Sequence, residues 1–207
     1  MKFAIRFAAL SALAMVLSAS FASAAPKTFT IDRSHSEVGF NIRHFFSKVH
    51  GRFENYSGTI VYDDKNLAAS TVEVSIADSS INTQTERRDN HLRSDAFFWT
   101  EKYPAFSFKS TKVVPGKDKT HFNVLGDLTM RGVTKPVTLA VEFLGSGDIS
   151  MGGSSMGTRA GFIATTTVNR QDYGISWNKV LDSGGAMLGD DVEIVLNIEA
   201  VEKVAAK

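Results

Sequence analysis

Hydrophobic side chains recur at every second position along much of this chain, and this alternation restricts the fold more than any other feature of the sequence. In residues 38–43, VGFNIR, Val, Phe and Ile alternate with Gly, Asn and Arg. Side chains of a β-strand point to opposite faces in turn, so the pattern predicts strands with one buried face. The same alternation occurs in residues 72–76, 106–108, 122–130, 137–143 and 192–198, and we expect further strands at 49–62 and 159–169.

Turn-forming residues separate these segments. Breakers occur at 63–66 (DDKN), at 115–118 (PGKD) and at Gly132 ahead of Lys135-Pro136, and the last two predict hairpins. The count is then eight or nine antiparallel strands in one domain. Such a chain forms a sandwich or a closed barrel, and closure leaves no exposed sheet edge.

Aromatic residues favour a wide barrel interior. Residues 25–207 contain twelve of the fifteen Phe, all four Tyr and both Trp, and many occupy the inward positions of predicted strands. An eight-stranded barrel has an interior that side chains can just fill or that can hold one small ligand. A ligand cavity and a fully packed aromatic core therefore both remain open.

Residues 83–108 combine a charged helical pattern with an aromatic run. Thr83 and Glu86 have capping-box spacing, which predicts a helix start. Spacings of three and four place Arg88, His91 and Asp95 on one face, and Asp89 is four residues before Arg93. The apolar run that follows, Ala96, Phe97, Phe98 and Trp99, has to be covered. We expect either a helical plug with a solvated salt-bridge face or the mouth of a ligand pocket.

The N-terminus has the pattern of a signal peptide. Lys2 and Arg6 precede an apolar stretch, and Ala22-Ser23-Ala24 is a small-residue cleavage site. The stretch is shorter than the ~20 residues of a spanning helix, so we expect cleavage before Ala25 and no stable membrane anchor afterwards. Residues 25–207 then form a single exported domain, and we expect a periplasmic location.

Charge and cysteine content narrow the class of protein further. Loss of Lys2 and Arg6 leaves 21 basic against 22 acidic residues, and a nearly neutral chain is not expected to bind nucleic acid. Cysteine is absent, so the stability of the domain has to come from an ordinary hydrophobic core.

Known catalytic and metal motifs find little support. Residues 182–185 (DSGG) echo a protease nucleophile segment, but Leu181 replaces the preceding glycine. No GK[ST] motif of a phosphate-binding loop occurs. The histidines His35, His44, His50 and His91 lack metal-ligand spacing. We therefore predict no metal and no catalysis; a lipid hydrolase or isomerase would need a catalytic pair in the lumen, such as His35 or His91 beside Ser or Asp.

Seven blocks in the order and spacing of this chain resemble the YceI-like family. They are Asp32–Ser36, then Val38-Gly39-Phe40 with His44, Gly51-Arg52-Phe53, Ser80–Thr83, Arg88–Leu92, Tyr103–Phe106 and Gly126–Val133. The resemblance covers about residues 27–202 and implies an all-β fold, namely an eight-stranded antiparallel lipocalin-like barrel with an apolar lumen and one short helix. It also implies binding of a polyisoprenoid or a similar long amphiphile, quinone-like molecules included, with no required cofactor. A homodimer is compatible with the sequence.

From these observations we expect a soluble carrier or sequestering protein for a long-chain lipid. The candidate ligand-binding residues are Phe40, Ile42, Phe53, Arg88, His91, Phe97, Phe98, Phe106, Phe108 and Phe162. Arg88 and His91 are the candidates for a phosphate or quinone oxygen because both can donate hydrogen bonds. A stress-induced structural or interaction protein is the alternative, and it would have a filled barrel. The Gly/Ser-rich stretch Gly145–Gly157 has no counterpart in the family pattern, and we expect a mobile hairpin loop there.

Overall fold

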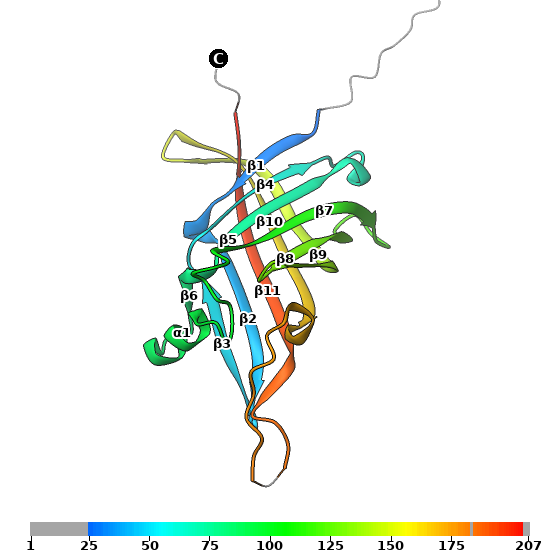
Figure 1. Cartoon of the computed structure of the whole chain (residues 1–207). Helices are drawn as coiled ribbons and strands as arrows, with labels where there is room; N and C mark the ends of the chain where they lie inside the picture. Colours follow the sequence, from blue (N-terminus) through cyan, green and yellow to red (C-terminus); the bar gives the residue numbers. More distant parts are fainter. Residues whose placement is uncertain (1–24, 183, 205–207) are drawn as a thin grey trace, which may run out of the picture.

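A computed structural model describes residues 25–182 and 184–204 (Figure 1). The predicted signal peptide, residues 1–24, lies outside them. The chain forms antiparallel strands, one α-helix and short 3-10 turns. The strands are β1 (Lys27–Ile31), β2 (Glu37–His44), β3 (Ser47–Phe53), β4 (Tyr56–Tyr62), β5 (Thr71–Ala77), β6 (Ile81–Asn82), β7 (Ala105–Pro115), β8 (His121–Met130), β9 (Val133–Met151), β10 (Ser154–Asn169) and β11 (Leu188–Glu202). The helix is α1 (Glu86–Arg93), and the 3-10 turns are η1 (Arg33–His35), η2 (Leu67–Ala69), η3 (Asp78–Ser80) and η4 (Arg170–Tyr173).

These eleven segments make a closed barrel of eight antiparallel strands, as predicted. The closed ring has the order β1-β4-β5-β7-β8-β9-β10-β11, and β11 pairs back with β1. β2 continues the line of β1 along β11, β3 pairs with β2, and β6 pairs with β3. The first three barrel strands are therefore each interrupted once, between β1 and β2, between β3 and β4, and between β5 and β6.

Side-chain hydrogen bonds bridge the first interruption. The Ser36 hydroxyl donates to the carbonyl of Glu199 at 3.0 Å and accepts from its N–H at 2.9 Å, in place of a backbone ladder pair. The Tyr56 hydroxyl donates to the Ser36 carbonyl at 2.7 Å. The buried backbone groups at the break are satisfied in this way, so the barrel stays closed where the strand changes direction.

The alternation seen in the sequence corresponds to the inside and outside of the barrel. In β8 the buried apolar residues are Phe122, Val124, Leu128 and Met130, and the exposed polar residues Asn123 and Asp127 point to the other face. In β7 a register shift between Ser110 and Lys112 moves the buried positions from Phe106 and Phe108 to Val113. A bulge of this kind places two residues of one strand opposite one of its neighbour.

Two strand predictions need correction. The segment 49–62 is not one strand, because the chain leaves β3 at Phe53 and re-enters the sheet at Tyr56. Gly145–Gly157 is not a loop: β9 continues to Met151 and β10 begins at Ser154. Strand pairing uses backbone groups that glycine also carries, and Gly152 and Gly153, with φ of 59° and 82°, supply the two-residue turn between the strands.

The predicted capping box is also wrong. The helix begins at Glu86 with Thr85 as the N-cap, because Asp89 takes both donors of Thr83: its Oδ1 accepts the Thr83 N–H at 2.9 Å and the hydroxyl at 2.5 Å. The expected Asp89–Arg93 ion pair does not form, since Arg93 donates to the carbonyls of Ser79 and Ile81. Asp95 lies beyond the end of α1.

Candidate ligand-binding cavity

The barrel encloses a cavity of about 740 Å³, within the range of small-molecule sites in proteins. Apolar side chains from β2–β5 and β7–β11 form most of its lining. On β11 the lining runs from Leu188 to Ile198, and at about 3.3 Å per residue this is roughly 30 Å of strand. The filled barrel that a purely structural protein would have is therefore not the arrangement found.

All ten residues predicted to bind a ligand line this cavity: Phe40, Ile42, Phe53, Arg88, His91, Phe97, Phe98, Phe106, Phe108 and Phe162. Phe53 lies at the centre of one aromatic group, with ring centroids 5.9 Å from Phe40, 6.0 Å from Phe98 and 5.4 Å from Phe106. At the opposite end, Phe162 packs 5.3 Å from Phe143 and 5.7 Å from Tyr62. The rings pack against one another along the wall and leave the middle of the barrel open.

Two glycines make room for the rings that line this wall. Gly51 is paired directly with Phe40 across β3 and β2, and a Cβ at Gly51 would overlap the Phe40 ring. Gly126 on β8 lies in the same way beneath the ring of Phe108. The absence of a side chain at these two positions allows each ring to lie against the neighbouring strand instead of across the lumen.

Polar groups in the lining gather near α1, where Thr83, Thr85, Arg87, Arg88 and His91 reach the cavity. Arg88 Nε donates to the Thr83 hydroxyl at 2.7 Å, and Nη2 donates to the Thr83 carbonyl at 2.7 Å and the Thr85 hydroxyl at 3.2 Å. These bonds hold the guanidinium at the cavity wall and do not use Nη1. The Arg88 side chain therefore bonds to Thr83 and Thr85, and these bonds do not connect it directly to Asp89 or Asp95.

His91 closes the wall beside this group. Its ring packs edge-on against Phe97 and Trp177, with both centroids at 4.9 Å. Phe97 is buried, whereas His91 is exposed, so the imidazole lies between solvent and cavity. The aromatic run after α1 thus borders a mouth of the cavity.

Two residues of this end were missed by sequence reasoning. Arg170 is 3% exposed; it donates to the carbonyls of Ile175, Trp177 and Gly189 and pairs with Asp190 at 2.8 Å. These bonds fasten the segment after η4 to the start of β11 and place Trp177 against His91. The second missed residue is Trp177, and the only local sign of its role is that it is an isolated Trp in a polar segment. No local sequence pattern indicates the role of Arg170.

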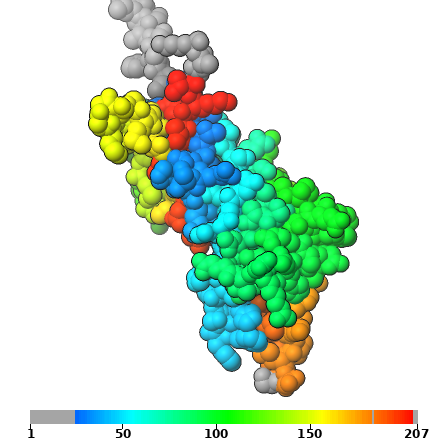
Figure 2. Space-filling view, turned by 90° about the vertical axis from the view of Figure 1, so that its left-hand side faces the viewer, coloured from blue at the N-terminus to red at the C-terminus, as the bar shows by residue number. Residues whose placement is uncertain are grey.

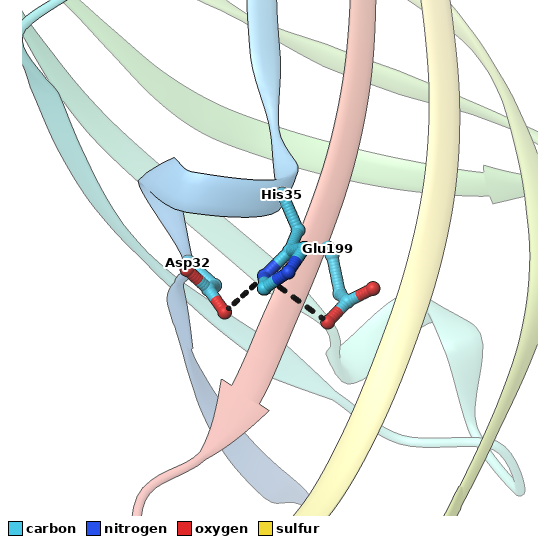
Figure 3. A group of neighbouring side chains, drawn as sticks. All are labelled: Asp32, His35 and Glu199. Carbon is cyan, nitrogen blue, oxygen red and sulfur yellow. Dashed lines mark hydrogen bonds and ion pairs between the residues drawn. The ribbon is translucent and has the colours of Figure 1, made fainter.

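A second polar cluster lies outside the cavity (Figure 3). Nδ1 of His35 is 2.9 Å from Asp32 Oδ2 and 4.0 Å from Glu199 Oε1, and these three are the one potential metal-binding group among the described residues. The same two carboxylate oxygens accept from Arg159 Nη1. A cation would have to displace the guanidinium, so the donor set is that of an ion-pair cluster.

This cluster does not have the geometry of a catalytic triad either. The Ser34 hydroxyl donates to Asp32 at 2.5 Å and lies 3.3 Å from Nδ1 of His35, the nitrogen that also contacts Asp32. In a triad the serine and the acid address different ring nitrogens. The other predicted histidines are separated: His44 lines the cavity at the end of β2, and His50 is exposed on β3. Ser183 of the protease-like segment lies outside the described residues.

Two ionisable side chains of the described residues, Asp78 and Tyr173, have buried oxygens without a hydrogen-bond partner. Asp78 in η3 is fully buried, and its carboxylate oxygens have no hydrogen-bond partner in the described part of the chain. Burial raises the pKa of Asp78 to about 6. The carboxyl lies at the interruption between β5 and β6.

Comparisons with known proteins agree with this architecture. Residues 29–200 match the model of the YceI-like domain. A UPF0312 protein of Staphylococcus aureus (strain N315) is 39% identical over 172 residues, which are 83% of this chain and 95% of the relative. The crystal structure of the Campylobacter jejuni YCEI protein is 32% identical and covers 84% of this chain and 96% of its own, with a TM-score of 0.65.

A third comparison concerns the fold alone. The structure of a polyisoprenoid binding domain from Saccharophagus degradans, implicated in plant cell wall breakdown, is 15% identical; the match covers 84% of this chain and 98% of that domain, with a TM-score of 0.57. Within the described ranges, no helix has the length and apolarity needed to cross a bilayer. The match over residues 29–200 and the 39% identity to the UPF0312 protein show that this chain belongs to the YceI-like domain family.

Proposed function

We propose that this protein binds a long isoprenoid, or a similar amphiphile such as a quinone, in the barrel cavity and carries or sequesters it without catalysis. The observation that carries the proposal is the elongated apolar cavity of about 740 Å³ whose charged lining residues, Arg87, Arg88 and Arg170, lie toward the α1 end. The structural likeness to a polyisoprenoid binding domain supports the same class of ligand. No cofactor is needed for this function.

Simple energetics make such a ligand reasonable. Burial of one methylene contributes roughly 0.8 kcal/mol, so about fifteen buried methylene equivalents give roughly 12 kcal/mol. Association costs about 4 kcal/mol or more, and about −8 kcal/mol corresponds to micromolar affinity. Because the lining offers few hydrogen bonds to the tail, the cavity selects its ligand by length and girth.

In this proposal the tail lies along the barrel and the head group lies at the α1 end. Arg88 is held with Nη1 free of the bonds to Thr83 and Thr85, and His91 stands at the boundary with solvent. Arg presents several donors to a phosphate or carbonyl oxygen, and His can donate or accept. The two side chains therefore suit an oxygen-bearing head group.

A binding role is favoured over lipid-modifying chemistry by the surroundings of the histidines. The described contacts of His91 are the rings of Phe97 and Trp177, and the Ser34–His35–Asp32 group lies outside the cavity lining. We further propose that the protein acts in the periplasm after export, which the N-terminal sequence pattern supports.

Native mass spectrometry of the purified protein, followed by extraction and identification of the released lipid, tests the proposal. We expect a long isoprenoid or quinone-like mass, and micromolar binding of an added isoprenoid alcohol. Thr166→Trp, at a lining position of β10, should reduce this binding; Thr165→Trp, next to it on the exposed face, is the matched control. A protein that releases no lipid and binds no added isoprenoid, or equal binding by the two variants, would contradict the cavity as the site.

A further inference from the structure

Three aromatic rings meet at the end of the cavity that is remote from α1. Tyr62, the last residue of β4, is 7% exposed, and its ring centroid is 4.7 Å from that of Phe143 on β9 and 5.7 Å from that of Phe162 on β10. The rings of Phe143 and Phe162 are 5.3 Å apart. We call Tyr62, Phe143 and Phe162 the aromatic floor.

The position of Tyr62 along β4 places the floor far from the polar end of the cavity. The start of β4, Tyr56, pairs with Ile76 near the end of β5, and β6 and α1 follow from there. Tyr62 is six residues further along β4, which is roughly 20 Å of strand, and it pairs with Lys27 at the start of β1. In Figure 2, β1 (blue) and the β9–β10 hairpin (yellow) lie at one end of the molecule, and the β2–β3 turn (light blue) and the segment before β11 (orange) lie at the other.

The contacts of Tyr62 cross the interior of the barrel. In the closed ring of eight strands β4 is the second and β9 the sixth, so the two strands stand on opposite sides. By contrast, Phe40 and Phe53, with ring centroids 5.9 Å apart, are on the paired strands β2 and β3 and leave the lumen open. A contact between opposite strands has to span the lumen. The floor therefore blocks the barrel at this level.

A packed layer continues beyond the floor. On four strands the inward residue that follows the last lining residue does not itself line the cavity: Phe29 on β1, Phe143 on β9, Ala160 on β10 and Ala200 on β11. Phe29, Ala160 and Ala200 are 0%, 2% and 0% exposed, and Ala160 and Ala200 pair directly. The cavity thus has a closed end, and Tyr62 and Phe162 are the floor residues that face it.

A ligand tail that extends from the α1 end meets Tyr62 as it reaches this closed end. Each buried methylene raises the affinity roughly fourfold, so affinity grows with tail length as long as the added carbons find space in the cavity. Once the tail touches the floor, further carbons have to fold back or remain in water near the mouth. The affinity then stops growing, and the length at which this happens depends on the place of the floor.

We propose that the Tyr62 ring sets the greatest tail length that the cavity buries. This inference rests on the proposed function and names the residue that gives the cavity its length selectivity. Removal of the ring joins its space to the cavity, and a phenol ring is close in size to one isoprene unit, so the limit should move by about one unit. The packed layer of Phe29, Ala160 and Ala200 prevents a larger change.

Titration with alcohols of graded length tests the role of Tyr62. One series is isoprenoid and a second is straight-chain, and the break point is the length at which affinity stops rising. In Tyr62→Ala the break point should move up by about one isoprene unit, and the first alcohol beyond the original break point should bind about tenfold more tightly than to the unaltered chain. Tyr62→Phe, which keeps the ring, should restore the original break point. Tyr62→Leu serves in place of Tyr62→Ala if that variant does not fold.

Phe143→Leu is the matched control, because it removes a ring of the same cluster that does not line the cavity. Its break point should equal that of the unaltered chain even if its thermal midpoint falls. An unmoved break point in the Tyr62→Ala protein, an equal shift in the control, or an equal gain for short and long alcohols overturns the role of Tyr62 and leaves the proposed function standing.

The two series separate this inference from the proposed function. If the unaltered chain binds straight-chain alcohols but no isoprenoid alcohol, the isoprenoid function is overturned, and the break points of the straight-chain series decide whether Tyr62 limits the tail. Binding of neither series by the unaltered chain overturns both proposals.

Discussion

Arg159 donates from Nη1 to Oδ2 of Asp32 at 2.9 Å and so joins β10 to the interruption between β1 and β2, across 127 residues of sequence. The same nitrogen contacts Glu199 on β11. Both partners of the Arg159–Asp32 pair are mostly shielded, with side-chain exposures of 19% and 16%. The Ser34 hydroxyl, His35 and Arg159 together hold the pKa of Asp32 well below its usual range. The pair therefore fixes the barrel where its first strand is broken.

Arg159→Met should consequently destabilise the fold, because it leaves the carboxylates of Asp32 and Glu199 close together without their shared cation. We expect the thermal midpoint at neutral pH to fall by roughly 2 to 6 °C. Lys27→Met removes an exposed pair with Glu202 and should have little effect. Differential scanning calorimetry measures both; equal midpoints for the two variants would assign Arg159 no special role.

Asp78→Asn should remove a pH-dependent loss of stability. Burial raises the folded-state pKa from 3.8 to about 6, so the folded protein retains a proton that the unfolded chain has released. The stability gained from this proton is complete below pH 3.8 and is lost as the pH rises to about 6. The free energy of unfolding of Asp78→Asn should be nearly the same as that of the unaltered chain at pH 4. Above pH 7 it should be higher by up to about 3 kcal/mol.

Urea unfolding from pH 4 to 8 checks the Asp78 prediction. Asp32 and Asp118 have lowered pKa values and shape the curve in the opposite direction, but they are present in both proteins and cancel in the difference. A difference that stays constant with pH would show that Asp78 does not titrate in this range.

Phe40→Trp and Phe108→Trp should shorten or narrow the space for the tail. Both rings line the cavity and lie over Gly51 and Gly126, so the larger indole has to extend into the lumen. We expect weaker binding of long isoprenoids, smaller losses for short ones and nearly unchanged unfolding midpoints. Titration with isoprenoid alcohols of graded length measures this, and unaltered binding of the longest one would refute the placement of the tail.

Arg88→Ala with His91→Ala should weaken binding of an isoprenoid phosphate more than that of the uncharged alcohol. A hydrogen bond to a charged group contributes about 1.5 to 3 kcal/mol, which corresponds to roughly a tenfold to hundredfold selective loss. Arg93→Ala is the control, since Arg93 is on the same helix but donates to Ser79 and Ile81 and does not line the cavity. Equal weakening of both ligands would make Arg88 and His91 structural residues.

The mature chain should begin at Ala25. Ala22 and Ala24 satisfy the small-residue positions of a cleavage site, and Pro26 disfavours a cut immediately before it. N-terminal sequencing of the protein from a periplasmic extract decides this. Recovery of the chain from the cytoplasm with Met1 intact would remove the basis for the periplasmic proposal.

The barrel was predictable because alternation of apolar residues is a local property that directly records the two faces of a strand. The inward Phe positions followed from the same parity. The sequence predicts a loop where the β9–β10 hairpin lies, since backbone pairing leaves no mark in a run of Gly and Ser. The spacing of Thr83 and Glu86 predicts a capping box, but Asp89, six residues beyond Thr83, takes the donors of Thr83 once the turn has formed.

The polar end of the cavity was less accessible to sequence reasoning. Arg88 and His91 were found because they share a helix face, whereas Arg170 acts through Gly189 and Asp190, about twenty residues away in the chain. Trp177 reaches His91 only because Arg170 fixes its segment. Contacts of this kind depend on the closed barrel, so no local pattern could have indicated them.

The glycines beneath Phe40 and Phe108 show that the width of the cavity does not depend only on the residues that line it. A methyl group at Gly51 or Gly126 would force the neighbouring ring inward and narrow the lumen while every lining residue kept its identity. Proteins of this fold with identical walls can therefore differ in the size of cargo they admit. In a comparison of such proteins, the first positions to examine are those of Gly51 and Gly126, where this chain carries no side chain.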